Sequence, residues 1–131
     1  MEGKMKIPKI LIVDDERSVR QALCFELEDA GYDVINAATY QEAMDLYHLS
    51  GADMVITDLF LESGSGMDLV DKIKREKEEI PYIVITAFPD SELGEQAKSI
   101  CKERFYTKPF FMDSLTNQIN EIFKSQSVQF A

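Results

Sequence analysis

The sequence predicts a single α/β domain built on an open, doubly wound parallel sheet with helices on both faces. Three observations lead to this fold class. The chain has 131 residues, a length suited to one hydrophobic core. Short apolar runs rich in β-branched residues recur along the chain, and segments with helical spacing of apolar residues separate them. Strands and helices that alternate in this way are typical of parallel sheets whose crossover helices cover both faces.

The predicted strands are short and rich in valine and isoleucine, the pattern of strands buried on both faces of a sheet. The first reads Lys-Ile-Leu-Ile-Val-Asp, and the third and fourth read Asp-Met-Val-Ile-Thr-Asp and Tyr-Ile-Val-Ile-Thr-Ala. The fifth candidate is the weakest. The expected ranges are 9–14, 32–37, 53–58, 82–87 and 104–107.

A helix is predicted after each strand. The first ends at Gly31, a typical C-terminal stop, and the second follows Thr39, whose spacing from Glu42 is that of a capping box. Gly51 follows the second helix, and Asp113 is a candidate cap for the fifth. The apolar residues at helical spacing are Val19, Leu23, Leu27 and Ala30 in the first helix, Ala43, Leu46 and Tyr47 in the second, Leu69, Val70 and Ile73 in the third, Leu93, Ala97, Ile100 and Cys101 in the fourth, and Met112, Leu115, Ile119, Ile122 and Phe123 in the fifth.

Five βα units are too few for a closed eight-stranded barrel, so the sheet is expected to be open. The ligand site of such a sheet lies outside the carboxyl ends of its strands. We expect the domain to occupy residues 9–124, after an N-terminal extension (1–8) and before a short C-terminal tail (125–131).

Charge and composition argue against several classes of function. The net charge of −10 opposes contact with phosphate backbones, so this domain is not expected to bind nucleic acid directly. The longest apolar run near the N-terminus, residues 10–13, is far shorter than the roughly 20 residues of a membrane helix. Cys24 and Cys101 form neither a CxxC pair nor a Cys/His cluster. We therefore expect a cytoplasmic protein whose partner is a protein or a cation.

Acidic residues follow the first and third predicted strands. Asp14, Asp15 and Glu16 end the first strand, and Asp58 ends the third. Carboxylates brought together at one sheet edge repel one another unless a positive charge lies between them. Mg²⁺ prefers oxygen ligands and is usually held by one or two carboxylates together with phosphate oxygens. The acidic residues therefore predict a divalent cation site.

Two further polar residues are expected at the same edge. Thr86 nearly ends the fourth strand, and Lys108 follows the fifth. The lysine ammonium suits a phosphate oxygen or a carboxylate, and the threonine hydroxyl can donate a hydrogen bond to the same group. Because an aspartate carboxylate can act as a nucleophile towards phosphorus, the group as a whole predicts a phosphoryl site.

The sequence resembles the bacterial response-regulator receiver domain of two-component and phosphorelay signalling. The resemblance covers about residues 9–124 and rests on four motifs in the family's order and spacing. They are Ile-Leu-Ile-Val-Asp-Asp-Glu at 10–16, Thr57-Asp58-Leu59 followed by Gly66, Ile85-Thr86-Ala87, and Thr107-Lys108-Pro109-Phe110. The resemblance implies a flavodoxin-like (βα)₅ fold with strand order 2-1-3-4-5.

The resemblance also assigns roles to individual residues. Asp58 is implied as the phosphoacceptor, with Mg²⁺ or Mn²⁺ held chiefly by Asp15, with Asp14 and Asp58 contributing, and by the backbone carbonyl of Phe60. The implied phosphoryl-binding and switch residues are Thr86, Ala87, Lys108 and Phe105, and Pro109 is the candidate for a cis peptide bond. Phe105 occupies the position of the switch aromatic, where the family more often has tyrosine, so no phenolic hydroxyl is available there.

The implied activity is signalling, and the chain is not expected to be a turnover enzyme, although it would assist its own phosphorylation and slow dephosphorylation. Its expected partners are a sensor histidine kinase or phosphotransfer protein and a downstream protein or missing output domain. The expected output face comprises the fourth helix, fifth strand and fifth helix, and a phosphorylation-linked homodimer is left open. No membrane association is expected.

Two aromatic residues suggest a control on phosphoryl lifetime. Phe60 lies two residues after Asp58, and Phe88 lies two residues after Thr86. Bulky rings on both sides of the phosphoryl group would obstruct the water that hydrolyses it, so we hypothesise slow self-dephosphorylation.

Two other interpretations of these residues are open. A receiver-like protein-binding module that works without phosphorylation is the main alternative, and the presence of Asp15, Asp58, Thr86 and Lys108 together argues against it. The second alternative is a haloacid-dehalogenase-type phosphatase. That family needs an aspartate two positions after its nucleophile, but here Glu16 stands two positions after Asp14, which argues against this interpretation.

Overall fold

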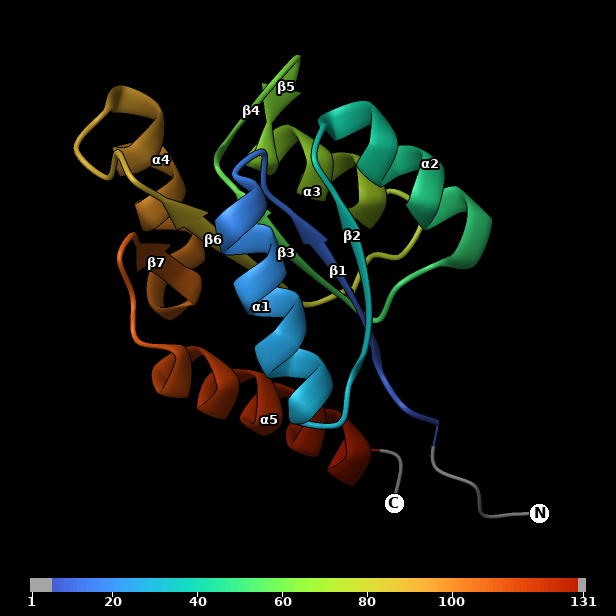
Figure 1. Ribbon diagram of the computed structural model, residues 1–131. Helices are drawn as coiled ribbons and strands as arrows, with labels where there is room; N and C mark the ends of the chain where they lie inside the picture. The colour runs from blue at the N-terminus through green and yellow to red at the C-terminus, as the bar shows by residue number, and fades with distance from the viewer. Residues whose placement is uncertain (1–5, 130–131) are drawn as a thin grey trace.

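The five long strands form one parallel sheet in the computed structural model, which describes residues 6–129 (Figure 1). Their order is β2-β1-β3-β6-β7, which is 2-1-3-4-5 when the parallel strands alone are counted. The predicted fold class is therefore confirmed. Residues 1–5 of the expected N-terminal extension and 130–131 of the expected tail lie outside the described residues. The strands are β1 Lys9–Val13, β2 Asp33–Ala37, β3 Met54–Asp58, β6 Tyr82–Thr86 and β7 Phe105–Thr107.

Each parallel strand is followed by a helix, as the alternating pattern predicts. The helices are α1 Arg17–Asp29, α2 Tyr40–Ser50, α3 Gly66–Lys74, α4 Glu92–Cys101, the short 3₁₀ turn η1 Lys102–Arg104, and α5 Met112–Gln129. The last helix continues past Lys124, because no glycine or proline interrupts the sequence after that residue. Asp113 lies in the first turn of α5 and does not precede the helix, so the prediction that it caps α5 was wrong.

The predicted helix ends agree with the caps in the structure. Gly31, after α1, has a φ of 99°, a left-handed conformation that favours glycine. The Thr39 Oγ1 accepts a hydrogen bond from the Glu42 N–H at 3.1 Å, as a capping box requires. The Glu42 carboxylate reaches back to the Ala38 N–H at 2.6 Å, one residue before the cap.

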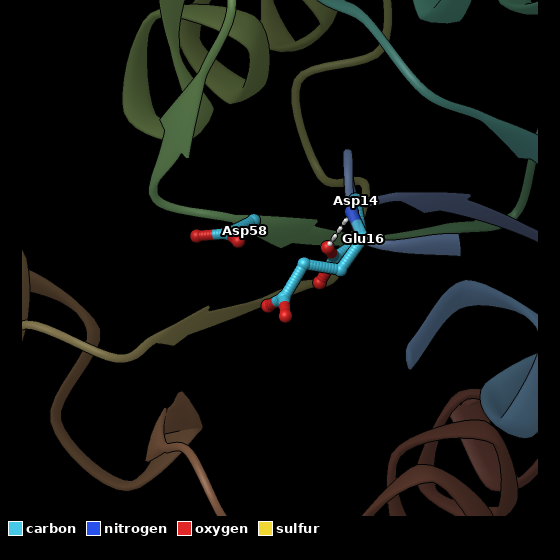
Figure 2. A group of neighbouring side chains, drawn as sticks. All are labelled: Asp14, Glu16 and Asp58. Carbon is cyan, nitrogen blue, oxygen red and sulfur yellow. Dashed lines mark hydrogen bonds between the residues drawn. The ribbon is translucent and has the colours of Figure 1, made fainter. Parts of the chain in front are cut away.

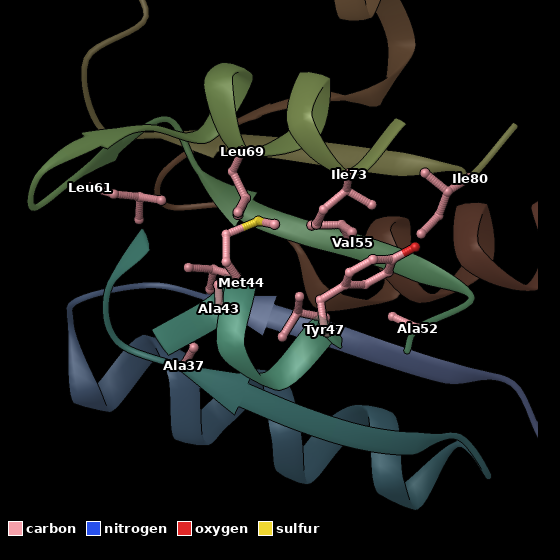
Figure 3. Packing of buried hydrophobic residues seen from close by; sticks show 12 residues of the cluster. Ala37, Ala43, Met44, Tyr47, Ala52, Val55, Leu61, Leu69, Ile73 and Ile80 are labelled. Carbon is pink, nitrogen blue, oxygen red and sulfur yellow. The ribbon is translucent and has the colours of Figure 1, made fainter. Parts of the chain in front are cut away.

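Alternate residues of the central strands face two large hydrophobic clusters, one on each face of the sheet. Ile10, Ile12 and Ile56 pack with α1 and α5 on one face of the sheet. Leu11 and Val55 pack with α2 and α3 on the other face, where Met44, Tyr47, Leu69 and Ile73 meet them (Figure 3). Each fully buried aliphatic side chain of this kind contributes about 1.5–3 kcal/mol to stability. These two clusters bury the central strands on both faces and so position their carboxyl ends.

A short antiparallel hairpin lies between β3 and α3, in a segment where no strand was predicted. It consists of β4 Phe60–Leu61 and β5 Gly64–Ser65. Leu61 is buried in the core beside α2 and α3, and a Cβ on Gly64 would lie 2.9 Å from the Tyr40 ring. The hairpin therefore packs closely against the start of α2.

None of the helices within residues 6–129 is both long enough and apolar enough to cross a membrane.

Candidate functional site

The carboxyl ends of β1, β3 and β6 carry side chains that are fixed by one recurring local interaction. Asp14 Oδ1 accepts a hydrogen bond from the backbone N–H two residues further on at 2.8 Å. Asp58 Oδ1 and Thr86 Oγ1 accept the equivalent bonds at 3.1 Å and 3.0 Å. The donors are the N–H groups of Glu16, Phe60 and Phe88. Short polar side chains commonly turn the backbone in this way, and here the turn leaves the second oxygen of each aspartate free to face the site.

Lys108 occupies the centre of the site. Its Nζ lies 2.9 Å from Asp14 Oδ2, 2.9 Å from Asp58 Oδ2 and 2.8 Å from Glu16 Oε1. The Lys108 N–H also donates to the Thr86 carbonyl at 2.8 Å, which fixes its backbone beside β6. The peptide bond between Lys108 and Pro109 is cis, as predicted. Figure 2 shows the side chains of Asp14, Glu16 and Asp58, which lie near one another at the carboxyl ends of β1 and β3.

Burial and charge pairing act in opposite directions on these groups. Burial raises the pKa of Asp14, and the hydrogen bonds from Lys108 and from the Glu16 N–H only partly offset this effect. Burial alone would lower the pKa of Lys108, but its hydrogen bonds to Glu16, Asp58 and Asp14 outweigh burial and raise the pKa above its ordinary value. Lys108 is therefore a permanent positive charge at physiological pH.

Among the described residues, Glu16 is grouped with Asp14 and Asp58, and Asp15 is not part of that group. The acidic group whose ligand oxygens all lie within 4.8 Å of one another consists of Asp14, Glu16 and Asp58, within the described part of the chain. Asp15 is exposed. Glu16 occupies the residue before α1 without capping it by its side chain, so its carboxylate is available to Lys108. The implied role of Asp15 as the main cation ligand stays a prediction.

The backbone after Asp58 is held tightly. The Thr57 hydroxyl donates to the Asp58 carbonyl at 2.8 Å, and the Gly66 N–H donates to the Leu59 carbonyl at 2.7 Å. A Cβ on Gly66 would collide with the Asp58 carbonyl oxygen, so only glycine fits there. This close approach gives a physical reason for the glycine in the Thr57-Asp58-Leu59…Gly66 motif.

The aromatic residues that follow Asp58 and Thr86 by two positions contact each other. The centroids of Phe60 and Phe88 are 5.9 Å apart with an interplanar angle of 80°, an edge-to-face contact. Phe60 is 37% exposed and Phe88 63% exposed, so both rings lie at the surface. Ala87, between Thr86 and Phe88, is also exposed.

Phe105 and Tyr106 point to different sides of β7. Phe105 is half-buried against the cluster formed by Leu59, Val84, Ala97 and Cys101, beneath α4. The Tyr106 hydroxyl donates to Gln118 Oε1 on α5 at 2.7 Å. Phe105 is thus the aromatic residue on the α4 side, three positions before Lys108.

The chemistry of the site suits a hard divalent cation and an anionic group. Each buried aspartate directs one carboxylate oxygen towards the same space, and oxygen-only ligands favour Mg²⁺ or Mn²⁺ over softer metals. Lys108 and the Thr86 hydroxyl supply hydrogen-bond donors for an oxyanion placed there. The residues present therefore fit a magnesium ion and a phosphoryl group.

Comparisons with known proteins identify the family. A model of the response regulator receiver domain matches residues 10–120. The phosphate regulon transcriptional regulatory protein PhoB of Escherichia coli is 29% identical over 118 residues, which cover 88% of this chain and 52% of that protein. The chain spans about half the length of the curated relatives of this kind.

Solved structures agree with the family match. The chemotaxis response regulator CheY4 of Vibrio cholerae is 26% identical and superposes with a TM-score of 0.76, covering 89% of this chain and 99% of that one. A response regulator receiver domain protein from Clostridium thermocellum is 29% identical with a TM-score of 0.79, covering 94% and 99% of the two chains. The matched segment runs from β1 into α5 and contains every strand-end residue described above. The chain therefore belongs to the response regulator receiver domain family.

Proposed function

We propose that the chain is the phosphorylation-dependent switch of a two-component pathway, in which Asp58 accepts a phosphoryl group from a sensor histidine kinase or phosphotransfer protein. One observation carries the proposal: the Asp58 side chain, 10% exposed, meets the Lys108 ammonium at 2.9 Å within a group that also contains Asp14. An aspartate that served only as a surface cap would not need a buried cation beside it. Members of this family are signalling phosphoacceptors and are not generally classed as enzymes.

The reaction uses Asp58 as the nucleophile. One carboxylate oxygen attacks phosphorus, the bond from phosphorus to the donor nitrogen breaks, and the departing imidazole keeps that electron pair and is free to take up a proton. Lys108, the Thr86 hydroxyl and the Ala87 N–H are the proposed donors of hydrogen bonds to phosphoryl oxygens. Mg²⁺, when bound, would neutralise negative charge on these oxygens. Asp14, Asp15, Asp58 and the Phe60 carbonyl are the proposed ligands.

The readout is proposed to pass through Thr86 and Phe105. When Thr86 donates to the phosphoryl group, its oxygen leaves the Phe88 N–H and space opens beside β6, into which the Phe105 ring turns. This movement alters the face formed by α4, β7 and α5, which a downstream protein or an output domain then recognises. Several relatives are transcriptional regulators, so an output domain in a longer chain is one form of this proposal. The same face is the candidate surface for a phosphorylation-linked homodimer, and the proposed location is the cytoplasm.

The direct test is the intact mass of the protein after incubation with Mg²⁺ and a small acyl-phosphate donor. The wild type should gain one phosphoryl group and Asp58→Asn should gain none. Asp71→Asn, an exposed aspartate on α3, is the matched control and should behave as the wild type. If the wild type gains no phosphoryl group across a full metal titration and with candidate kinases, the chain is a protein-binding module that acts without phosphorylation.

The ring pair supports a proposal about phosphoryl lifetime. Phe60 and Phe88 follow Asp58 and Thr86 by two residues, and their rings are in edge-to-face contact. We expect this pair to obstruct a water that attacks in line with the bond to phosphorus. Replacing both with serine should accelerate phosphoryl loss from Asp58 by roughly tenfold, about 1.4 kcal/mol in barrier. Phe25→Ser, which changes an exposed phenylalanine on α1, is the control. Decay rates that are equal in the double variant and the wild type would contradict the proposal.

A further inference from the structure

The oxygens that face a cation at this site are the same oxygens that Lys108 already holds. Asp14 Oδ1 and Asp58 Oδ1 are bound by backbone N–H groups, which leaves Oδ2 of each residue for other partners. Both Oδ2 atoms lie 2.9 Å from Lys108 Nζ. A divalent cation held by these two aspartates therefore competes with the ammonium for the same positions, and the two positive charges repel each other.

Lys108 cannot simply retreat into the protein when it gives up those oxygens. Its side chain is only 11% exposed, and a partly buried ammonium without a hydrogen-bond partner is costly. The cation site can therefore fill cheaply only if Lys108 keeps another acceptor nearby.

Glu16 is placed to be that acceptor. Its Oε1 lies 2.8 Å from Lys108 Nζ, and its side chain is 57% exposed, whereas those of Asp14 and Asp58 are 2% and 10% exposed. Its backbone is fixed, because its N–H donates to Asp14 Oδ1 and it is the residue directly before α1. Its carboxylate is not used as a helix cap, so it is free to follow the ammonium.

We propose that Glu16 is a positioning residue for Lys108: it retains the ammonium when a divalent cation takes the Asp14 and Asp58 oxygens, and it thereby sets the affinity of the site for the cation. The inference rests on the proposed function, since it concerns the same site. It assigns to Glu16 a role that acts through Lys108 and not through direct coordination of the metal.

A double-mutant cycle on cation affinity tests this role without any phosphorylation. Mn²⁺ binding is measured by electron paramagnetic resonance of the free ion, with Mg²⁺ as competitor, in the wild type, Glu16→Gln, Lys108→Met and the double variant. Glu16→Gln should weaken Mn²⁺ binding by at least about threefold, the effect of losing one partly exposed charge pair. Lys108→Met should strengthen binding, because the competing ammonium is gone. Glu16→Gln should change the logarithm of the Mn²⁺ dissociation constant less than half as much in the Lys108→Met background as it does in the wild type.

Controls separate this coupling from a general loss of negative charge. Glu26→Gln removes an exposed carboxylate from the same helix and should leave the Mn²⁺ affinity close to that of the wild type. Thermal melts verify that each variant is folded, and Lys108→Gln replaces Lys108→Met if the latter is not.

Three results would overturn the inference: no Mn²⁺ binding by the wild type, no weakening in Glu16→Gln, or an equal weakening with and without Lys108. The last result would make Glu16 a direct ligand or a source of bulk charge. Intact mass after treatment with an acyl phosphate reports separately on Asp58. If Asp58 is modified but the cycle shows no coupling, only the role of Glu16 fails, and if the cycle shows coupling but Asp58 stays unmodified, only the proposed function fails.

Discussion

Asp14 is a buried carboxylate, and its ionisation lowers the free energy of unfolding. It is 1% exposed, and burial raises its pKa even though Lys108 lies 2.9 Å away. A raised pKa in the folded state means that the protonated form is favoured by folding. The corresponding stability is fully present below the ordinary aspartate pKa of 3.8 and is lost as the pH rises through the raised value.

Asp14→Asn should therefore stabilise the protein at neutral pH when no divalent cation is present. Asparagine can still accept the Glu16 N–H, and Lys108 keeps Asp58 and Glu16 as partners. We expect the melting temperature of the variant to exceed that of the wild type by a few degrees at about pH 7, with the gap closing towards about pH 4. Melting curves of the two proteins in a chelator at both pH values measure this, with Asp71→Asn as the exposed control. A gap that does not depend on pH would show that the cost does not arise from ionisation of Asp14.

The sequence predicted which residues reach the sheet edge but not how each side chain is turned. Asp14, Asp58, Thr86 and Lys108 follow from the alternation of strands and helices, because parallel strands end at one edge. Whether Asp15 or Glu16 turns inwards depends on the backbone at the start of α1, where Glu16 has an extended conformation. Neighbouring acidic residues carry no local signal for that choice.

Ser91 makes two side-chain hydrogen bonds in the connection between β6 and α4. Ser91 Oγ accepts the Gly94 N–H at 3.0 Å as the cap of α4 and donates to the Phe88 carbonyl at 2.8 Å. The same hydroxyl thus joins the helix to the loop that follows Thr86. The elements that carry the proposed readout are coupled through this contact.

Ser91→Ala should lower the free energy of unfolding by about 1 kcal/mol, the usual value for the loss of a helix N-cap. Ser99→Ala, an exposed change within α4, should have a smaller effect. Chemical denaturation of both variants gives the comparison. Equal stabilities of the two variants would mean that the hydroxyl of Ser91 adds nothing beyond helix propensity.

Long elements with a clear period were predicted well, and short or marginal ones were not. The buried strands and the first four helices end close to the expected residues, because apolar spacing, glycine and N-cap residues mark them. The β4–β5 hairpin has two residues in each strand, too few to show an alternating pattern. It forms because Leu61 enters the core and Gly64 packs against Tyr40, contacts between residues distant in sequence that no local pattern reveals.

The whole chain carries a charge of −10, and the site concentrates part of that charge in one place. Within the site, Lys108 balances only one of the three carboxylates that it contacts. A cation that binds the folded state alone must stabilise that state by mass action.

Mg²⁺ should therefore raise the stability of the wild type by about 1.4 kcal/mol at ten times its dissociation constant, with a matching rise in melting temperature. Asp58→Asn should show a much smaller rise, because the cation loses a charged ligand. Potassium chloride at matched ionic strength controls for screening of the net charge. If Mg²⁺ and the matched salt raise the melting temperature equally, the stabilisation is general screening and not a bound ion.

The most direct test of the account is chemical identification of the phosphorylated residue. An acyl phosphate on aspartate is reduced by borohydride to homoserine, and peptide mass spectrometry then locates that conversion in the chain. After treatment with Mg²⁺ and an acyl-phosphate donor, we expect homoserine at residue 58 and no conversion at Asp14 or Asp15. Conversion at one of those residues, or at none in a protein that binds Mg²⁺, would contradict it.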